Sequence, residues 1–389
     1  MPLPDTLRSG AVNAPESGIV AVMNHGRRVG GVLPLWAGEG DLPTPDFIRS
    51  AAVEAIDAGE TFYTWQRGIP ELRDALARYH NRHFVPWTTA ENFFVTGSGM
   101  QAIQIALQAI AGAGDEVIYL SPAWPNFAAA AGIAGATAVP VSLEFGVDGW
   151  QLDLEKLQAK VSPRTRAIFI KSPSNPTGWT ASREELSALL AFARQRGIWI
   201  IADEIYALFH YGVDRAASFL DVMGPEDRVI FVNSVSKSWA MTGWRIGWMT
   251  VHPSLGPVIE NLIQYSTSGV AQFMQKAAVV ALDQGDDFIR MQVGRALKAR
   301  DILCAKLLAT GKVQLSPPDG AFYLYFKVGG VNDSLQAAFS IVDNVKVGIA
   351  PGSAFAADDT GWFRVCFNRS PEDIETGADR LALWIDRFA

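Results

Sequence analysis

The chain is poor in cysteine: its 389 residues include only two, Cys304 and Cys366. Neither lies in a C-x-x-C or metal-ligand spacing, which excludes a disulfide framework and favours a reducing, cytoplasmic compartment. Histidine is scarce too, and its spacing does not predict a metal site, so none is expected. The five histidines are interpreted as surface or core residues: His25, His80, His83, His210 and His252.

The sequence also lacks an excess of positive charge. It has 33 Lys and Arg against 40 Asp and Glu, a net charge of −7. Without a basic run, nucleic acid and anionic membranes are not expected as partners. The N-terminus, Met-Pro-Leu-Pro-Asp, has no basic region leading into an apolar one, so no signal peptide is predicted. Two uncharged stretches, 93–114 and 117–143, contain Gly, Pro, Ser and Gln and predict buried strands and helices rather than membrane spans.

What the chain does contain is an alternation of strands and helices. It is 49% hydrophobic, enough for a large core. Continuous apolarity within short segments predicts strands buried on both faces, hence an α/β fold with a mostly parallel sheet covered by helices. The predicted strands are Phe93–Thr96, Val117–Leu120, Ala136–Val141, Ala167–Lys171, Ile198–Ala202, Val229–Asn233 and Ile246–Val251.

Helix boundaries and domains follow from caps and composition. Thr44-Pro45 predicts a helix start with Thr44 as N-cap, Pro70 starts a second helix, and Ser182 with Glu185 forms a capping box. Residues 1–40 carry Pro and Gly throughout and are predicted to be irregular. We expect an N-terminal arm (1–44) that contributes to a small domain, a large α/β domain (45–285) and a small α+β domain (286–389).

Residues that directly follow the strands predict an anion site. In an open α/β sheet, ligands bind beyond the carboxyl ends of the strands. Gly97-Ser98-Gly99 opens a helix there, so its backbone N–H groups are placed to bind a phosphate. Arg245 is suited to clamp the same phosphate, and Ser234 and Ser236 to donate hydrogen bonds to it.

Three further side chains at these strand ends predict a ring-shaped cofactor. Asp203 follows a buried strand, where a lone carboxylate needs a cation, and a protonated ring nitrogen would supply one. Lys237 is the only lysine among the residues singled out here. Desolvated beside Arg245, its pKa is expected to fall, leaving a nucleophilic amine. Trp124 offers a flat face for stacking.

This combination closely resembles the fold type I pyridoxal 5′-phosphate enzymes, specifically the class I/II aminotransferases. The most specific signature is Ser-x-Ser-Lys at 234–237 followed by Gly-Trp-Arg-Ile-Gly at 243–247. Asn-Pro-Thr-Gly at 175–178 and Asp-Glu-Ile-Tyr at 203–206 precede it in the expected order. The resemblance extends from Gly38 to Arg364.

The resemblance implies a role for each matched residue. Lys237 corresponds to the lysine that binds the cofactor aldehyde covalently, and Asp203 to the partner of the ring nitrogen. Asn175 and Tyr206 correspond to the residues that hydrogen-bond the ring phenolate oxygen, and Trp124 to the residue stacked on the ring. The phosphate would be held by Ser98, Gly99, Met100, Ser234, Ser236 and Arg245. The substrate would contact Gly38, Trp124, Asn175 and Arg364, with Arg364 binding its α-carboxylate.

The resemblance also implies an assembly and a reaction. Tyr63 matches a tyrosine that reaches the phosphate of the neighbouring subunit, which implies a homodimer with its sites at the interface. The implied reaction transfers the amino group of an L-amino acid to a 2-oxo acid by a ping-pong mechanism through pyridoxamine phosphate. Two positions depart from the family pattern: Ser172 stands where a first Asn is frequent, and Met100 where Lys or Thr is frequent.

Several alternatives stay open at this point. A β-lyase, decarboxylase or acyl transferase would use the same lysine and ring contacts. Gly97–Ala102 also fits a dinucleotide-binding motif, but its expected acid, Asp115 or Glu116, precedes a strand instead of ending one. A ligand-sensing regulator would carry an added DNA-binding domain, for which 40 N-terminal residues are too few. For the substrate pocket the sequence offers Trp36, Trp65, Trp179 and Tyr265, each of which has packing as its alternative role.

Overall fold

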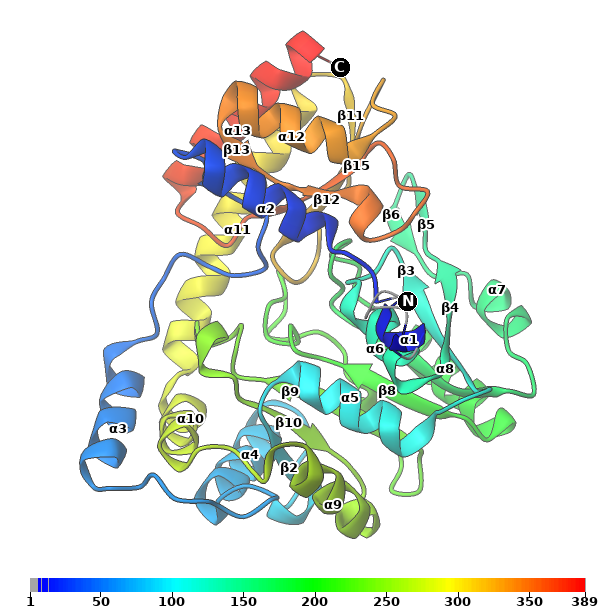
Figure 1. The fold of residues 1–389 in the computed structure, drawn as a ribbon, viewed down its shortest axis with the longest axis vertical. Helices are drawn as coiled ribbons and strands as arrows, with labels where there is room; N and C mark the ends of the chain where they lie inside the picture. Colours follow the sequence, from blue (N-terminus) through cyan, green and yellow to red (C-terminus); the bar gives the residue numbers. More distant parts are fainter. Residues whose placement is uncertain (1–5, 8, 13, 389) are drawn as a thin grey trace.

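A seven-stranded sheet forms the larger part of the molecule (Figure 1). The computed structural model describes residues 6–7, 9–12 and 14–388. Neighbouring strands are parallel except β10, which runs antiparallel to both its neighbours. The strand order is β2 (Phe93–Thr96), β10 (Gly247–Thr250), β9 (Val229–Ser234), β8 (Trp199–Asp203), β7 (Thr165–Lys171), β3 (Glu116–Ser121) and β4 (Thr137–Ser142).

Helices cover both faces of this sheet because its strands are apolar on both sides. In β3, Val117 packs toward one helical layer and the next residue, Ile118, toward the other. The first layer contains α5 (Gly99–Ile110), α6 (Asn126–Ala134) and α9 (Gly256–Thr267). The second contains α3 (Asp46–Asp57), α4 (Pro70–His83), α7 (Leu154–Ala159), α8 (Arg183–Arg196) and α10 (Gln272–Gln284). The short strands β5 (Glu144–Gly146) and β6 (Gly149–Gln151) form a hairpin.

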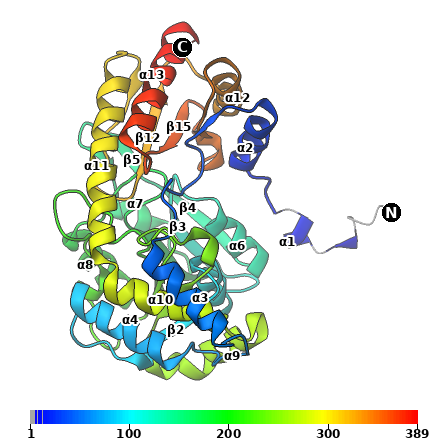
Figure 2. The same cartoon turned by 90° about the vertical axis from the view of Figure 1, so that its left-hand side faces the viewer.

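A smaller antiparallel sheet forms the second part, with strand order β11 (Val313–Gln314), β12 (Tyr323–Val328), β15 (Trp362–Cys366) and β14 (Ala350–Pro351). The helices beside it are α11 (Asp286–Leu308), α12 (Ser334–Val345) and α13 (Pro371–Phe388). Figure 2 shows α11 running from this part down to α10. Gln292 of α11 donates to the Ser238 carbonyl at 2.8 Å, while Leu303 and Leu307 lie in the small-sheet core, so one helix holds both parts together.

The prediction that the N-terminal segment is irregular is wrong. The segment contains a twelve-residue helix, α2 (Gly18–Val29), after a short α1 (Ser9–Val12). The Ser17 side chain caps α2 by accepting from the Val20 amide at 3.3 Å. Gly26 lowers the intrinsic helix propensity, but a Cβ there would lie 2.4 Å from the Trp36 ring, so tertiary packing requires it. Residues 1–5, 8 and 13 of the predicted arm lie outside the described residues. Further along, β1 (Leu33–Pro34) pairs with β13 (Val347–Gly348) in a separate two-stranded sheet, which joins the arm to the smaller part of the molecule.

The other predicted elements can be compared directly with the structure. All seven predicted strands are present, with boundaries shifted by two residues at most. The capping box of α8 is confirmed, and α4 begins at Pro70. Thr44 is not an N-cap: its hydroxyl donates to the Ala240 carbonyl at 2.7 Å and accepts from Trp244 at 2.9 Å, because tertiary partners are available. Over the described part of the chain, no helix combines the length and apolarity needed to cross a bilayer.

Candidate active site

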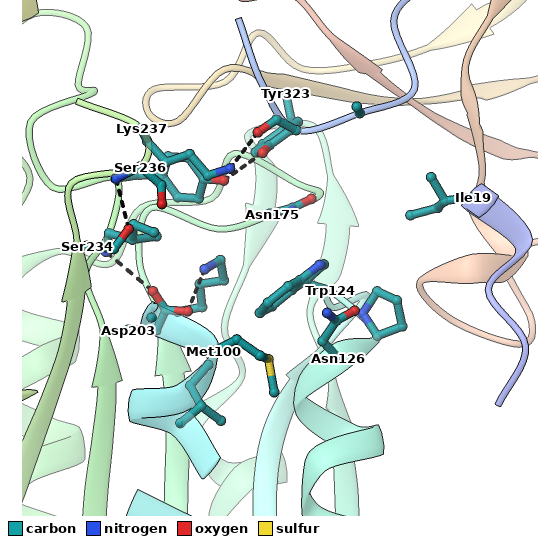
Figure 3. Close-up of a pocket in the computed structure, with 18 of the residues that line it drawn as sticks. Ile19, Met100, Trp124, Asn126, Asn175, Asp203, Ser234, Ser236, Lys237 and Tyr323 are labelled. Carbon is teal, nitrogen blue, oxygen red and sulfur yellow. Dashed lines mark hydrogen bonds and ion pairs between the residues drawn. The ribbon is translucent and has the colours of Figure 1, made fainter. Parts of the chain in front are cut away.

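A cavity of about 420 Å³ lies at the carboxyl ends of the large-sheet strands, below the small sheet (Figure 3). It brings together most of the predicted site residues, from segments spread over more than 300 positions of the chain. Those on its wall are Gly38, Gly99, Met100, Trp124, Asn175, Asp203, Tyr206, Ser234, Ser236, Lys237, Arg245 and Arg364. Ser98 and Tyr63 are not on this wall.

Lys237 follows β9, and its ammonium reaches across to the N-terminal segment. Its Nζ donates to the Gly38 carbonyl at 2.6 Å, and none of the described acidic side chains pairs with it. Burial is the main cause that lowers the pKa of Lys237 to about 8, and the positive charges of Lys171 and Arg364 contribute to this lowering. The direction agrees with the sequence prediction, but the cations responsible are these two instead of Arg245.

Asp203 ends β8 and has a cationic partner within the protein. The Nζ of Lys171 donates to its Oδ2 at 2.6 Å, and the Ile205 amide donates to Oδ1 at 3.3 Å. From the sequence, this carboxylate was predicted to lack a partner within the protein, and Lys237 was the only lysine predicted at the site. Both expectations are wrong, because Lys171 ends the neighbouring strand in register with Asp203.

Tyr206 and Asn175 meet residues of the small part. Tyr206 Oη lies 2.6 Å from Tyr323 Oη, and burial raises the pKa of Tyr206 well above its usual value. Asn175 Oδ1 accepts from Arg364 at 3.0 Å. The Asn175 carbonyl accepts from the Trp124 amide at 3.0 Å, which fixes the turn against the Trp124 segment. Tyr323 was not predicted, since nothing in its local sequence distinguishes it from a core aromatic residue.

Arg364, on β15, is a buried cation with unused donor capacity. It is 2% exposed, and none of the described carboxylates pairs with it. Its guanidinium donates to Asn175 and to the Trp36 carbonyl and lies over the Tyr323 ring, 4.7 Å from the centroid. Its Nε–H has no partner within the described part of the chain. A buried charge of this kind is strongly unfavourable unless an anion binds it, which makes the position suited to a carboxylate ligand.

The opposite end of the cavity offers donors to an anion. The amides of Gly99 and Met100 begin α5, where the helix leaves N–H groups free for a ligand. Ser98 serves as the N-cap, its Oγ accepting from the Gln101 amide at 3.0 Å, and Ser234 Oγ accepts from the Ser236 amide at 3.0 Å. Arg245 is exposed and has a φ of +57°, an unfavourable conformation for a non-glycine residue that is typical of functional positions.

The four proposed pocket aromatics are not together. Trp36 lies on the cavity wall, whereas Trp179 is buried in the core beneath α8. Trp65 and Tyr265 are exposed on the surface, as is Tyr63, which is 92% exposed. The wall facing Trp124 includes Ile19 of α2, which the sequence analysis had placed in an irregular arm (Figure 3).

These residues fit pyridoxal 5′-phosphate by their chemistry. The cavity has an amine of lowered pKa, a carboxylate, an aromatic face and, at one end, helix amides with an arginine. The arginine with an unpaired Nε lies among the residues expected to bind a substrate carboxylate. As for metals, no group of three or more potential ligands occurs in the part of the chain that was described.

Several known proteins are similar to this chain over most of its length. The family model "Aminotransferase class I and II" matches residues 31–381. The chain is 34% identical over 350 residues to the aspartate aminotransferase of Thermotoga maritima, covering 90% of each sequence. It is 35% identical over 361 residues to a probable aspartate/prephenate aminotransferase of Aquifex aeolicus, again covering 90% of each.

Solved structures give the same result for the fold. The Thermotoga maritima aspartate aminotransferase superposes with a TM-score of 0.91 at 31% identity, covering 98% of this chain and 100% of that one. The N-succinyldiaminopimelate aminotransferase of Mycobacterium tuberculosis gives 0.92 at 28% identity, covering 97% and 100%. The chain therefore belongs to the class I and II aminotransferase family and is a pyridoxal phosphate-dependent aminotransferase that acts on amino acid and 2-oxo acid substrates.

Proposed function

We propose that this enzyme holds pyridoxal phosphate in the cavity between its two sheets and transfers the amino group of an L-amino acid to a 2-oxo acid by a ping-pong mechanism. The single observation that carries the proposal is the placement of Lys237. Its buried amine, with a pKa lowered to about 8, lies on the same wall as Asp203 and Arg364. A β-lyase or decarboxylase would need the same amine, and the family match favours transamination.

The predicted site residues on the wall each have a task in this proposal. When bound, pyridoxal phosphate supplies an aldehyde that exchanges for the substrate amino group and a ring that stabilises negative charge at the substrate α-carbon. Lys237 would hold the cofactor covalently, and its amine would take the proton from the substrate α-carbon. Asp203 holds the proton of the ring nitrogen, Asn175 and Tyr206 hold the phenolate oxygen, and Trp124 stacks on the ring.

Two arginines orient the bound molecules at opposite ends. Arg364 binds the substrate α-carboxylate through its unpaired Nε, with the Gly38 backbone assisting and Asn175 and Trp124 beside it. Arg245 binds the cofactor phosphate with Ser234, Ser236, and the Ser98–Met100 segment at the start of α5. This arrangement fixes the α-carbon between the two charged ends and within reach of Lys237.

We further propose a homodimer. Tyr63 is 92% exposed and off the cavity wall, so it cannot reach the phosphate of its own subunit in this arrangement. Two aromatic residues close to Tyr63 in the sequence, Phe62 and Trp65, are also exposed, at 81% and 61%. Tyr265, from a distant part of the sequence, is 88% exposed. Large exposed aromatic side chains favour a protein interface. Sedimentation analysis of the wild type and Tyr63→Ala, with cofactor release as a second readout, tests this assembly.

The proposed domain division is 1–44, 45–285 and 286–389, supported by the two separate sheets. A cytoplasmic location is proposed on the two free, buried cysteines. Limited proteolysis with mass analysis of the fragments tests the first of these proposals, and cell fractionation tests the second.

The experiment for the activity is an absorbance spectrum of the purified enzyme before and after each of a set of L-amino acids, without an oxo acid. L-Aspartate is included because several similar proteins are named for it. L-Phenylalanine and L-leucine are included because Ile19, Val20 and Trp36 give the cavity an apolar side. Loss of the aldehyde-form band with release of one equivalent of 2-oxo acid supports transamination. A persistent band with release of carbon dioxide or pyruvate would assign a decarboxylase or lyase instead.

A further inference from the structure

Lys171 forms a buried ion pair with Asp203 in the cavity, and the proposed mechanism gives Lys171 no role. They end the neighbouring strands β7 and β8 and are paired in register. Lys171 Nζ lies 2.6 Å from Asp203 Oδ2, and the two side chains are 10% and 4% exposed. Both line the cavity. The pair is therefore part of the site, and because it is buried, solvent and salt weaken the attraction between its two charges only slightly.

The position of the Lys171 ammonium is further defined by two aromatic rings. Its Nζ lies 5.6 Å from the centroid of the Trp124 ring and 5.1 Å from that of the Tyr206 ring. Trp124 and Tyr206 are the residues proposed to stack on the cofactor ring and to bind its phenolate oxygen. Lys171 thus places a positive charge among the groups proposed to surround that ring.

With the cofactor bound, Lys171 and a protonated ring nitrogen would both interact with the Asp203 carboxylate. A buried carboxylate without an internal partner depends on the ring nitrogen for its compensating charge. Asp203 already has a partner in Lys171, so a protonated ring nitrogen adds less stabilisation and is repelled by the nearby ammonium. The ring-nitrogen contact is therefore weakened by this arrangement.

We propose that Lys171 is a positioning residue that shares the Asp203 carboxylate with the cofactor ring nitrogen and thereby reduces the contribution of that nitrogen to cofactor binding. The inference rests on the proposed cofactor site. Lys171 is distinct from Lys237 in its chemistry, because its amine is engaged by a carboxylate, whereas among the described residues that of Lys237 donates to the Gly38 carbonyl.

The test compares binding of two cofactors that differ only at the ring nitrogen. Cofactor-stripped wild type, Lys171→Met and Lys171→Arg are titrated with pyridoxal phosphate and with its analogue that has a C–H in place of the nitrogen, followed by absorbance. The measured quantity is the affinity for pyridoxal phosphate divided by the affinity for the analogue. We expect this ratio to be about tenfold or more higher in Lys171→Met than in the wild type, equivalent to about 1.4 kcal/mol, and to have the wild-type value in Lys171→Arg. An unchanged or smaller ratio in Lys171→Met overturns the proposal.

Controls separate the possible failures. Lys306→Met removes an ion-paired lysine on the small part, bound to Asp379, and should leave the ratio unchanged. Binding of the analogue reports whether the Lys171 variant is folded, and Lys171→Gln replaces Lys171→Met if the latter does not fold. A wild type that binds neither compound contradicts the proposed cofactor site. A wild type that binds both, with no change of ratio on substitution, contradicts only the role of Lys171.

Discussion

Charged side chains at the two ends of the large sheet differ in whether they form ion pairs. At the amino end, where β3 and β7 begin, Arg164 pairs with Glu116 and Arg166 with Asp115 at 2.7 Å. In the cavity at the carboxyl end, Lys237 is partly buried and Arg364 of the small sheet is buried, and among the described residues neither meets a carboxylate. At the amino end these charges are neutralised by pairing within the protein, whereas at the cavity only Lys171 and Asp203 pair in this way, and Lys237 and Arg364 are left for a ligand.

This difference also bears on the dinucleotide-binding alternative. Glu116 and Asp115 were its expected ribose ligands. Both are engaged with arginines at the amino end of β3, the opposite end of the strand from the cavity. They therefore cannot contact a ligand bound at the α5 N-terminus, and the family match independently identifies an aminotransferase.

The largest effect is expected from removing the Lys237 amine, which lies unpaired with any described carboxylate at the carboxyl end of the sheet. Lys237→Ala should reduce kcat by on the order of 10⁴-fold or more, because both covalent attachment and proton transfer are lost. Turnover with the best donor is the measurement, and circular dichroism checks the fold. A variant with near wild-type turnover would contradict the proposed site.

The same amine should make stability depend on pH. The pKa of Lys237 in the folded chain is about 8, below its ordinary value of 10.5, so between these pH values the unfolded chain binds more protons. The free energy of unfolding of cofactor-free wild type, relative to Lys237→Met, should therefore rise from pH 8 to 10.5, by at most roughly 3 kcal/mol. Denaturant titrations at pH 7, 8, 9 and 10 measure this difference, and a difference that falls with pH would refute the burial of a titrating amine.

The unpaired arginine should matter for substrate more than for fold. Arg364→Met should lower kcat/KM by roughly 100-fold, since a buried charged hydrogen bond to the substrate carboxylate is lost. Arg166→Met is the matched control at the amino end, and its kcat/KM should change by less than about twofold. Equal effects of the two substitutions would remove the distinction between the ends.

The smallest effect is expected from the tyrosine pair. Tyr323→Phe removes the 2.6 Å contact to Tyr206 while keeping the ring over which Arg364 lies. Loss of one buried hydrogen bond should lower kcat/KM by roughly 2- to 10-fold. Tyr206→Phe should reduce it at least as much, since the resemblance gives Tyr206 the direct contact. A larger effect of Tyr323→Phe would mean that Tyr323 itself contacts the substrate.

Prediction from sequence succeeded where the signal is local. The β7 segment, the capping box of α8 and the Pro70 start of α4 all depend on residues within a few positions of each other. It failed for α2, whose Gly18 and Gly26 lower its helix propensity and whose stability comes from packing against the small part. The motif residues were identified because family motifs preserve order and spacing, while Lys171 was overlooked because it carries no such motif.

The sequence alone determined the strand–helix alternation, the α/β class, and the order of the motifs at the strand ends. Those properties depend on apolar periodicity and caps, which act over a few residues. Only the tertiary structure decided which charges are paired. Lys171 meets Asp203 across 32 positions, Tyr206 meets Tyr323 across 117, and Arg364 meets Asn175 across 189. Such contacts are set by strand register and by packing of the small sheet over the large one, which no local pattern specifies.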